Sequence, residues 1–599
     1  MKLSDYVMQF LVRNGVDQLF VLAGGACMHL VDSAGRTPGL EYVCCLHEQA
    51  CAFAAEAYAE YRMDLGAALV TAGPGGTNAI TGVAAAWLES ASCIFLSGQA
   101  KRADLLRNRG VRSMGQQELD IISVVRPITK YAVQVLDPNA IRYELEKAVW
   151  LAKHGRRGPV WLDIPLDVQA ADIKESALTS FEPDPVVPAL LQREVLAAVD
   201  LWNRSERPVL FLGNGIRAAH NHGLLNRLID LLQAPVLLTW KAVDIVPEDH
   251  PFYIGRPGAI GQRAANFTQQ NADCIMILGA RLDLPQTAFS HTNFARAATK
   301  VMVDIDPAEL AKMETPIDLA VCADASDFIG EVLRHAQLVA FRDRSDWCGR
   351  AKAWKQKYPV VLPEYWNQPL VNTYVFIDVL SEELNKDDLL VPGSSGPCSD
   401  IFMQAFRVKL GQRVVNAPGL GAMGTGLPGT IGACLAGGGR RTVCINGDGG
   451  FQLNIQELET VRRLNLPIKF FVLCNGGYAS IMTSQRIHFG RLVASDPSSQ
   501  LTLPDIQKVA AAYGLRTSQI DSHEHLREQI RNVLDTPGPI VCAVTTSPDQ
   551  ATAPRVTSTV QPDGSIMSHP MEDMWPFLSR EELSSNMIPS RKLKENTIS

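Results

Sequence analysis

The chain has 599 residues, of which 46% are hydrophobic and 20% are charged, and its formal net charge is -7. This length and composition are typical of a globular protein with several domains, and the negative charge argues against nucleic acid or an anionic membrane as its main partner. Its 13 cysteines are scattered, with no Cys-x-x-Cys pair. Scattered cysteines favour reduced thiols over a disulfide framework or a zinc site, so we expect a cytoplasmic protein.

Short apolar segments alternate with helical patterns along the chain, which is typical of α/β domains built on parallel sheets. We predict three doubly wound parallel-sheet domains over 1–170, 190–340 and 371–550, followed by a C-terminal tail over 551–599. The first and third blocks each contain a glycine-rich turn where a strand ends, which indicates that these two domains are similar. Apolar residues within Met571–Phe577 predict that the tail docks on the body of the protein.

The first block carries a carboxylate where a strand is followed by a helix. A strand over Tyr42–Cys45 precedes Glu48 and an alanine-rich helix over Cys51–Tyr61, whose small side chains allow close packing against a neighbouring element. Taken alone, Glu48 can be a helix-start carboxylate that complements the helix dipole. Thr71–Asn78 forms a second strand-to-helix glycine loop, and such a loop on its own can be an ordinary turn.

The third block contains the most informative spacing in the chain. A buried strand over Thr442–Ile445 ends in Gly447-Asp448-Gly449-Gly450, and a second strand over Ile468–Leu473 ends just before Asn475. This βαβ unit places Asp448 and Asn475 at the same edge of a parallel sheet, where such sheets bind ligands. A carboxylate, an amide and nearby carbonyls suit Mg²⁺, which completes its shell with phosphate oxygens. The glycine motif alone could be a turn, but the spaced asparagine favours function.

Together these motifs resemble the thiamine diphosphate-dependent enzymes of the acetohydroxyacid synthase group. The matching segments, in chain order, are Gly24–Ala26, His47–Gln49, Gly73–Gly75, Gln117–Asp120, Arg126–Lys130, Gly158–Pro165, Asp304–Pro307, Gly421–Gly424 and the Asp448/Asn475 motif. The resemblance implies thiamine diphosphate and Mg²⁺ as cofactors. It assigns Glu48, Gln117, Met423 and Gly25 to catalysis, Asp448, Asn475 and the Gly477 carbonyl to the metal, and Gly73, Asn78, Gly396, Ser399, Gly421, Met423, Gly449 and Gly450 to cofactor binding.

The resemblance also gives these residues roles. Glu48 would hydrogen-bond the pyrimidine ring, so that the cofactor can supply its own base. Met423 would hold the two cofactor rings in a bent geometry, although a methionine can also fill a gap in a core. Gly396 to Ser399 would cradle the diphosphate, but here Gly-Pro-Cys-Ser replaces the Gly-Gln-His-Gln of the synthases. In this group Glu48 acts on cofactor held by another subunit, which implies a homodimer or homotetramer with interfacial active sites.

The middle block resembles the flavin-binding domain of the same group. The matching positions are Gly213, Gly215, Gly258, Gly279, Arg281, Asp304 and Asp324. The synthases carry FAD without net redox in their reaction, so the resemblance implies FAD as a third cofactor. The alternative is a Rossmann-like domain whose glycines only turn the chain.

Two substitutions separate this chain from the synthases. Gln286 replaces an arginine that recognises the carboxylate of the acceptor 2-keto acid, and Gln485 replaces a tryptophan that favours 2-ketobutyrate. A glutamine cannot make the forked, charge-assisted contact of an arginine, and losing one such contact weakens binding by about 2 kcal/mol. We therefore expect an acceptor other than a second 2-keto acid in the usual pose.

Other residues, among them Tyr478-Ala479-Ser480, are closer to the YerE-like carboligase subgroup. The main prediction is therefore an enzyme that decarboxylates pyruvate and adds the activated acetaldehyde to an aldehyde or ketone, such as a keto-sugar. His29, Gln116 and Gln117 are candidate acceptor contacts, although such a histidine is more often a core residue. The alternatives are acetolactate synthesis from two 2-keto acids, a thiamine-dependent oxidase or simple decarboxylase, and a non-catalytic cofactor-binding regulator.

Overall fold

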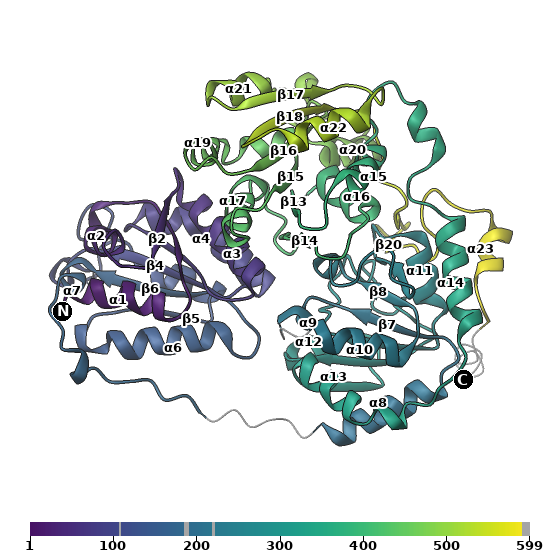
Figure 1. Ribbon diagram of the computed structural model, residues 1–599, viewed down its shortest axis with the longest axis horizontal. Coiled ribbons are helices and arrows are strands. Elements are labelled where there is room, and N and C mark those ends of the chain that lie inside the picture. The colour runs from purple at the N-terminus through teal and green to yellow at the C-terminus, as the bar shows by residue number, and fades with distance from the viewer. Residues whose placement is uncertain (107–108, 185–190, 219–221, 394, 590–599) are drawn as a thin grey trace. The chain divides into compact units, whose positions relative to one another are not determined.

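The structure is a computed structural model that describes residues 1–599 except 107–108, 185–190, 219–221, 394 and 590–599 (Figure 1). The chain divides into two compact units. Unit 1 comprises Met1–Val186, Asp387–Ser399 and Gln412–Pro548, and unit 2 comprises Val187–Lys386, Asp400–Gly411 and Asp549–Ser599. Three six-stranded parallel sheets with helices confirm the predicted α/β class, two of them in unit 1 and one in unit 2.

The N-terminal sheet of unit 1 has the strand order β2-β1-β3-β4-β6-β5. Its strands are β1 (Gln18–Val21), β2 (Glu41–Cys44), β3 (Gly66–Val70), β4 (Cys93–Gln99), β5 (Tyr131–Gln134) and β6 (Val160–Pro165). Its helices are α1 (Leu3–Arg13), α2 (Met28–Ala34), α3 (Glu48–Arg62), α4 (Pro74–Glu89), α5 (Ile121–Val125), α6 (Ile141–Lys153) and α7 (Leu166–Gln169). Helix α3 begins three residues before the predicted Cys51, where the His47 ring accepts a hydrogen bond from the Gln49 N–H.

The C-terminal sheet of unit 1 has the order β14-β13-β15-β16-β18-β17, which is the same permutation of six strands. The expected similarity of the first and third blocks is thereby confirmed. Its strands are β13 (Leu389–Pro392), β14 (Arg413–Val414), β15 (Thr442–Gly447), β16 (Ile468–Cys474), β17 (Arg516–Ile520) and β18 (Ile540–Thr545). Its helices are α17 (Gly426–Ala436), α18 (Asp448–Gln452), α19 (Leu458–Arg463), α20 (Ala479–Phe489), α21 (Ile506–Ala512) and α22 (Leu526–Asp535). Helix α16 (Pro397–Ala405) begins in unit 1 and ends in unit 2.

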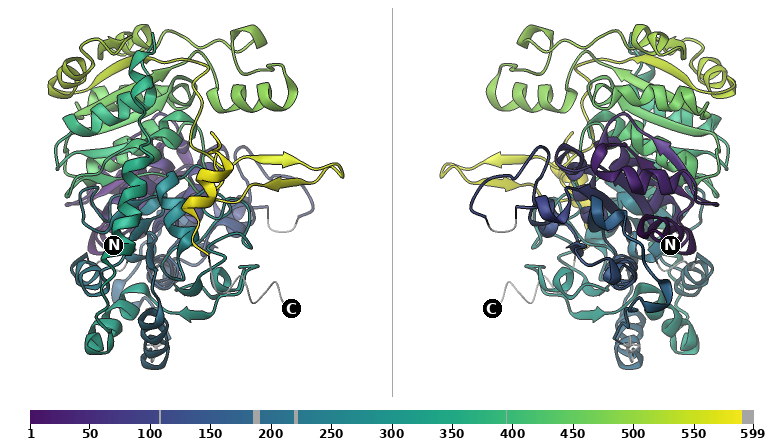
Figure 2. Two further views of the ribbon diagram at one scale, coloured as in Figure 1. Left: turned by 90° about the vertical axis from the view of Figure 1, so that its right-hand side faces the viewer. Right: turned by 90° about the vertical axis from the view of Figure 1, so that its left-hand side faces the viewer.

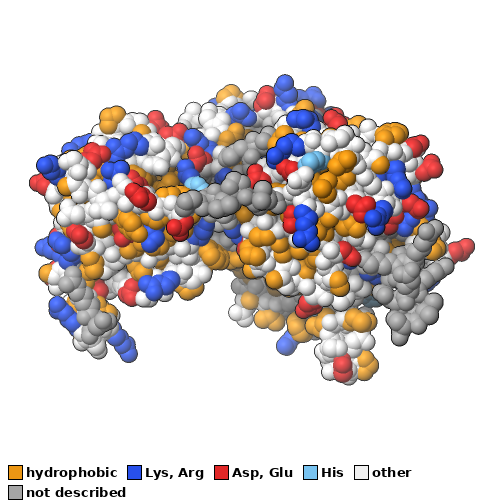
Figure 3. Space-filling view, turned by 90° about the horizontal axis from the view of Figure 1, so that it is seen from below, with side chains coloured by type: hydrophobic (Ala, Val, Ile, Leu, Met, Phe, Trp, Pro, Cys, Tyr) orange, Lys and Arg blue, Asp and Glu red, His pale blue; other side chains and the backbone are white. Residues whose placement is uncertain are grey.

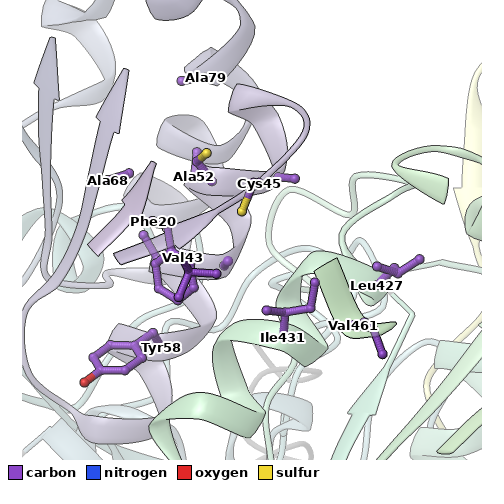
Figure 4. Packing of buried hydrophobic residues seen from close by; sticks show 14 of the residues in the cluster. Phe20, Val43, Cys45, Ala52, Tyr58, Ala68, Ala79, Leu427, Ile431 and Val461 are labelled. Atoms are coloured by element: carbon purple, nitrogen blue, oxygen red, sulfur yellow. The ribbon is translucent and has the colours of Figure 1, made fainter. Parts of the chain in front are cut away.

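Within unit 1, helices α3 and α17 pack directly against each other, and the small side chains of α3 allow this close approach. A Cβ placed on Gly432 of α17 would overlap the carbonyl oxygen of Ala54 on α3. One hydrophobic cluster continues across both domains, and Figure 4 shows Val43 on the N-terminal side of it and Ile431 on the C-terminal side. This close helix contact requires glycine at 432.

The sheet of unit 2 has the order β12-β11-β10-β7-β8-β9, which is the 3-2-1-4-5-6 arrangement of dinucleotide-binding domains. Its strands are β7 (Pro208–Leu212), β8 (Val236–Leu238), β9 (Tyr253–Gly255), β10 (Cys274–Leu278), β11 (Thr299–Asp304) and β12 (Leu319–Cys322). The helices of this unit are α8 (Gln192–Arg204), α9 (Gly215–Ala218), α10 (His222–Leu232), α11 (Arg263–Asn271), α12 (Pro307–Ala311), α13 (Ala325–Arg334), α14 (Ser345–Lys357), α15 (Thr373–Glu383) and α23 (Arg580–Asn586).

The tail contains a hairpin that was not predicted from the sequence. Strands β19 (Ser558–Val560) and β20 (Ile566–Ser568) form an antiparallel hairpin, drawn in yellow in Figure 2. Its turn is closed by the Asp563 carboxylate, which accepts the Ser565 N–H at 2.9 Å. The Pro-Asp-Gly-Ser sequence at this turn is the signal from which the hairpin could have been predicted. Met571 is 1% exposed in the core of unit 2, which confirms that the tail docks.

Candidate active site

The structure brings Asp448 and Asn475 together at the carboxyl edge of the C-terminal sheet. Asp448 follows β15 and is 7% exposed. Its Oδ2 accepts the N–H groups of Asn475 at 3.0 Å and Gly476 at 2.8 Å, and its Oδ1 accepts the Gly449 N–H at 2.8 Å. Burial raises the pKa of Asp448 to about 6, and these backbone hydrogen bonds oppose the shift.

This arrangement fits a divalent cation. In the described part of the chain, Oδ1 of Asp448 accepts one hydrogen bond and keeps a lone pair available. A Cβ at Gly477 would overlap the Ser495 carbonyl oxygen, so only glycine lets the 477 backbone lie there. A buried carboxylate, the Asn475 amide and a main-chain carbonyl are the hard oxygen donors that Mg²⁺ prefers.

Met423 lies beside the same loop. A Cβ at Gly449 would lie 3.6 Å from the Met423 methyl and 2.5 Å from the Tyr478 ring, so Gly449 sits between the two side chains. Met423 is half-buried, and Gly421 and Gly424 around it adopt φ of +64° and +93°, values that favour glycine. Its side chain is therefore placed next to the metal loop.

The predicted diphosphate cradle is the tight turn at Gly396 that opens into the first residues of α16. Gly396 has φ +71°, and its carbonyl accepts the Ser399 N–H at 2.9 Å. A Cβ at Gly396 would lie 3.3 Å from the Ser480 hydroxyl, at the start of α20. Gly450 is similarly close to Asn446, whose Oδ1 would lie 2.9 Å from an added Cβ.

In the N-terminal domain the structure brings Glu48 to Asn78. The Asn78 amide donates to Glu48 Oε2 at 3.0 Å, and Glu48 is 7% exposed. Gly73 and Gln117 also meet, because a Cβ at Gly73 would lie 2.7 Å from the Gln117 carbonyl oxygen. Gln117 has φ +63° and an exposed side chain, while Gly25 begins a short 3-10 helix with open space beside it.

Two of the predicted acceptor contacts, Gln286 and Gln485, make hydrogen bonds within their own units. The Gln286 amide donates to the Pro257 carbonyl at 2.7 Å. Gln485 exchanges two hydrogen bonds with the Val493 backbone, at 2.9 and 3.0 Å, and also accepts the Ser495 hydroxyl. His29 is half-buried, and burial lowers the pKa of its ring.

The remaining acceptor candidates are exposed in unit 1. Gln116 and Gln117 both present exposed side chains. Their roles, and those of Gln286, Gln485 and His29, stay predictions.

The predicted flavin positions lie at the carboxyl edge of the unit 2 sheet. Its topological switch lies between β7 and β10, where the Gly215 N–H donates to the Gly279 carbonyl at 3.0 Å. A Cβ at Gly213 would overlap that carbonyl, so glycine allows the two loops to meet. Asp324 caps α13 through the Ser326 N–H, and Asp304 Oδ1 accepts the Asp306 N–H.

Two further predicted flavin positions are tied to nearby loops. The Gly258 N–H donates to Asn266 at 2.9 Å, and Arg281 lies 3.5 Å from Asp283. An edge of this kind, with glycine loops meeting at the switch of a 3-2-1-4-5-6 sheet, fits a dinucleotide.

The surface carries no single sign of charge on the face drawn in Figure 3, where acidic and basic side chains are interspersed. Among the described residues no helix is long and apolar enough to cross a membrane.

The fold and these edges define an α/β enzyme in which two thiamine-type domains precede and follow a dinucleotide-type domain along the chain. Three family descriptions match in order: the thiamine pyrophosphate enzyme N-terminal TPP binding domain at 1–124, the central domain at 195–332 and the C-terminal TPP binding domain at 395–544. The chain belongs to the thiamine pyrophosphate enzyme family.

Curated relatives of this chain are acetolactate synthases. The large subunit from Pyropia yezoensis is 30% identical over 89% of this chain and 90% of its own length. The chloroplastic enzyme of Arabidopsis thaliana is 31% identical, over 93% of this chain and 83% of its own length. The isozyme 1 large subunit of Escherichia coli (strain K12) is 28% identical, over 92% and 95%. The protein is therefore a thiamine diphosphate-dependent enzyme whose relatives are acetolactate synthases.

Proposed function

We propose that this enzyme decarboxylates pyruvate and joins the resulting two-carbon unit to a second 2-keto acid, as an acetolactate synthase. The hydrogen bonds of Glu48 with Asn78 and of Asp448 with the Asn475 backbone support the cofactor chemistry of this proposal, and the curated relatives carry its choice of acceptor. The curated relatives support a 2-keto acid as acceptor over the keto-sugar that the sequence analysis placed first.

When bound, thiamine diphosphate supplies the nucleophilic carbon and the electron sink of this chemistry. Asp448, Asn475 and the Gly477 carbonyl would hold Mg²⁺, and the Gly396–Ser399 turn would take the diphosphate. Glu48 would hold a proton at the pyrimidine ring, with its carboxylate oriented by Asn78 at 3.0 Å.

A second candidate is the YerE-like transfer to an aldehyde or ketone. Gln286 favours it, because its amide is already bonded to Pro257 and offers no cation for an acceptor carboxylate. Incubation with pyruvate, 2-ketobutyrate and a simple ketone, followed by mass spectrometry, separates the two. Acetolactate or acetohydroxybutyrate as main product is expected; a tertiary alcohol from the ketone would instead establish the second candidate.

The proposal also includes FAD, which would bind at the switch point of the unit 2 sheet. Flavin absorbance in the purified protein tests whether FAD is bound. A cytoplasmic location is proposed because the described cysteines are all free thiols.

Two subunits would share each active site. A mixture of Glu48→Gln and Asp448→Asn variants should therefore regain activity after subunit exchange, whereas sites built within one chain would stay inactive.

A further inference from the structure

Within unit 1 one segment of the C-terminal domain makes hydrogen bonds to the turn that leads into Glu48. We define this turn, Cys44–Gln49, as the acid turn, and the segment Asn454–Arg463 as the clasp. Glu457 Oε1 accepts the Leu46 N–H at 2.8 Å. On the other side of the turn, Arg463 donates to the Cys44 carbonyl at 2.7 Å, and the Thr460 hydroxyl does so at 3.4 Å. The backbone before Glu48 is therefore fixed from the C-terminal domain.

Asn454 joins the acid turn to the loop of Met423. Its amide nitrogen donates to Gln49 Oε1 and to the Gly424 carbonyl, both at 3.0 Å. The backbone at Asn454 has φ +78°, a conformation that asparagine tolerates better than most residues. One side chain thus contacts the neighbour of Glu48 and the neighbour of Met423.

Glu457 is a buried carboxylate that the proposed mechanism leaves unused. It is 0% exposed, and besides Leu46 it accepts hydrogen bonds from Thr460 at 2.7 Å and Gln456 at 3.4 Å. Burial raises the pKa of Glu457, and the hydrogen bonds oppose that shift. A buried carboxylate is destabilising unless it is well bonded, and the bond that leaves its own segment goes to the acid turn.

We propose that Asn454 and Glu457 are positioning residues that hold the acid turn and thereby direct the Glu48 carboxylate toward the cofactor. The inference rests on the proposed function, since it concerns the same acid and the same cofactor. The physical reason is distance: a displacement of about 1 Å in a reacting group can slow a reaction about 100-fold. Residues that touch neither substrate nor cofactor can therefore control the rate by holding Glu48.

The test compares Glu457→Gln with Glu459→Gln, a matched substitution two residues away. Glu459 pairs with Arg462 on the exposed side of α19, so its variant should behave as wild type. The measurements are deuterium exchange at the reactive carbon of thiamine diphosphate with Mg²⁺, the Kd of thiamine diphosphate by fluorescence titration, and thermal unfolding. We expect exchange to fall about tenfold in Glu457→Gln while Kd changes less than about threefold.

A second variant covers the case in which Glu457→Gln does not fold. Asn454→Gly keeps the left-handed backbone but removes both bonds of the amide, and we expect the same loss of exchange with an unchanged KM for pyruvate. Exchange within twofold of the Glu459 variant in either folded protein would overturn the proposal. If wild type itself fails to accelerate exchange, the proposed function falls instead, so the two failures are distinguishable.

Discussion

The two sheets of unit 1 share one strand order, and each has a buried aspartate, on a strand or just past its end, whose pKa burial raises to about 6. In the N-terminal sheet Asp163 lies on β6 and accepts hydrogen bonds from the side chains of Ser97, Gln99 and Gln134 at 2.6–3.1 Å. In the C-terminal sheet Asp448 is bonded only by backbone N–H groups among the described residues.

The difference lies in what surrounds each carboxylate. Asp163 is 0% exposed within the sheet, and three side chains from β4 and β5 occupy its oxygens. Asp448 lies past the end of its strand, where main-chain groups orient it and leave a lone pair toward the edge. A raised pKa alone therefore does not identify a functional acid; the position along the strand and the kind of partner do.

The largest expected effect concerns the acid that the N-terminal sheet does place at its edge. Glu48→Gln keeps an oxygen for Asn78 but removes the shareable proton, so turnover should fall at least about 100-fold while thiamine diphosphate still binds. Steady-state kinetics and a cofactor titration check this. Glu41→Gln, at an exposed position of β2, is the control; near-normal turnover in the Glu48 variant would contradict the assignment.

Asp448→Asn should weaken cofactor binding in the presence of Mg²⁺ by at least about 10- to 100-fold, because even the loss of an outer-shell partner of a metal typically has an effect of that size. Wild-type affinity should also fall as pH drops through about 6, because protons compete with the cation for this carboxylate. The variant should lack that dependence. Calorimetric titration at several pH values measures both.

The raised pKa of Asp448 also predicts that the free energy of unfolding of wild type relative to Asp448→Asn depends on pH. Because the folded pKa of Asp448 is raised from 3.8 to about 6, the folded state binds the proton more tightly than the unfolded chain, and stability falls as pH rises between these values. Without metal, the free energy of unfolding of Asp448→Asn relative to wild type should therefore increase by up to about 3 kcal/mol between pH 4 and pH 7. A flat difference would show that Asp448 is not buried as described.

Asp163→Ala tests the other side of the comparison. Three side-chain donors lose their acceptor at once, so the free energy of unfolding should fall by about 3 kcal/mol, and Mg²⁺ should not restore it. Urea unfolding with and without Mg²⁺ measures this. A Mg²⁺-dependent loss would mean that Asp163 also serves the cofactor.

The positions of the candidate site residues at the sheet edges could be predicted because strand ends and glycine loops leave a local signal. Asp448, Asn475 and Glu48 each follow a short apolar run, and a parallel sheet brings such positions to one edge. Asn78, whose amide donates to Glu48, lies in a glycine loop that the resemblance assigns to cofactor binding.

The contacts between domains could not be predicted in this way. Glu457 meets Leu46 across 411 positions of the chain, and no local pattern records which helix packs on which. The sequence also does not show whether the amide of a glutamine faces a ligand or a neighbouring backbone. In the structure the amides of Gln485 and Gln286 both donate to backbone carbonyls.

The smallest effect concerns the helix contact that holds the two sheets together. Gly432→Ala places a methyl group against the Ala54 carbonyl, and since backbone on both sides must shift, the free energy of unfolding should fall by about 2 kcal/mol. Gly330→Ala is the matched control, because a Cβ there meets no atom within 4 Å and helix α13 should gain about 0.5–1 kcal/mol. Urea unfolding measures both. If the two variants were equally stable, the α3–α17 contact would have to be looser than the Ala54 overlap requires, and the edges carrying Glu48 and Asp448 would not be held at a fixed spacing by it.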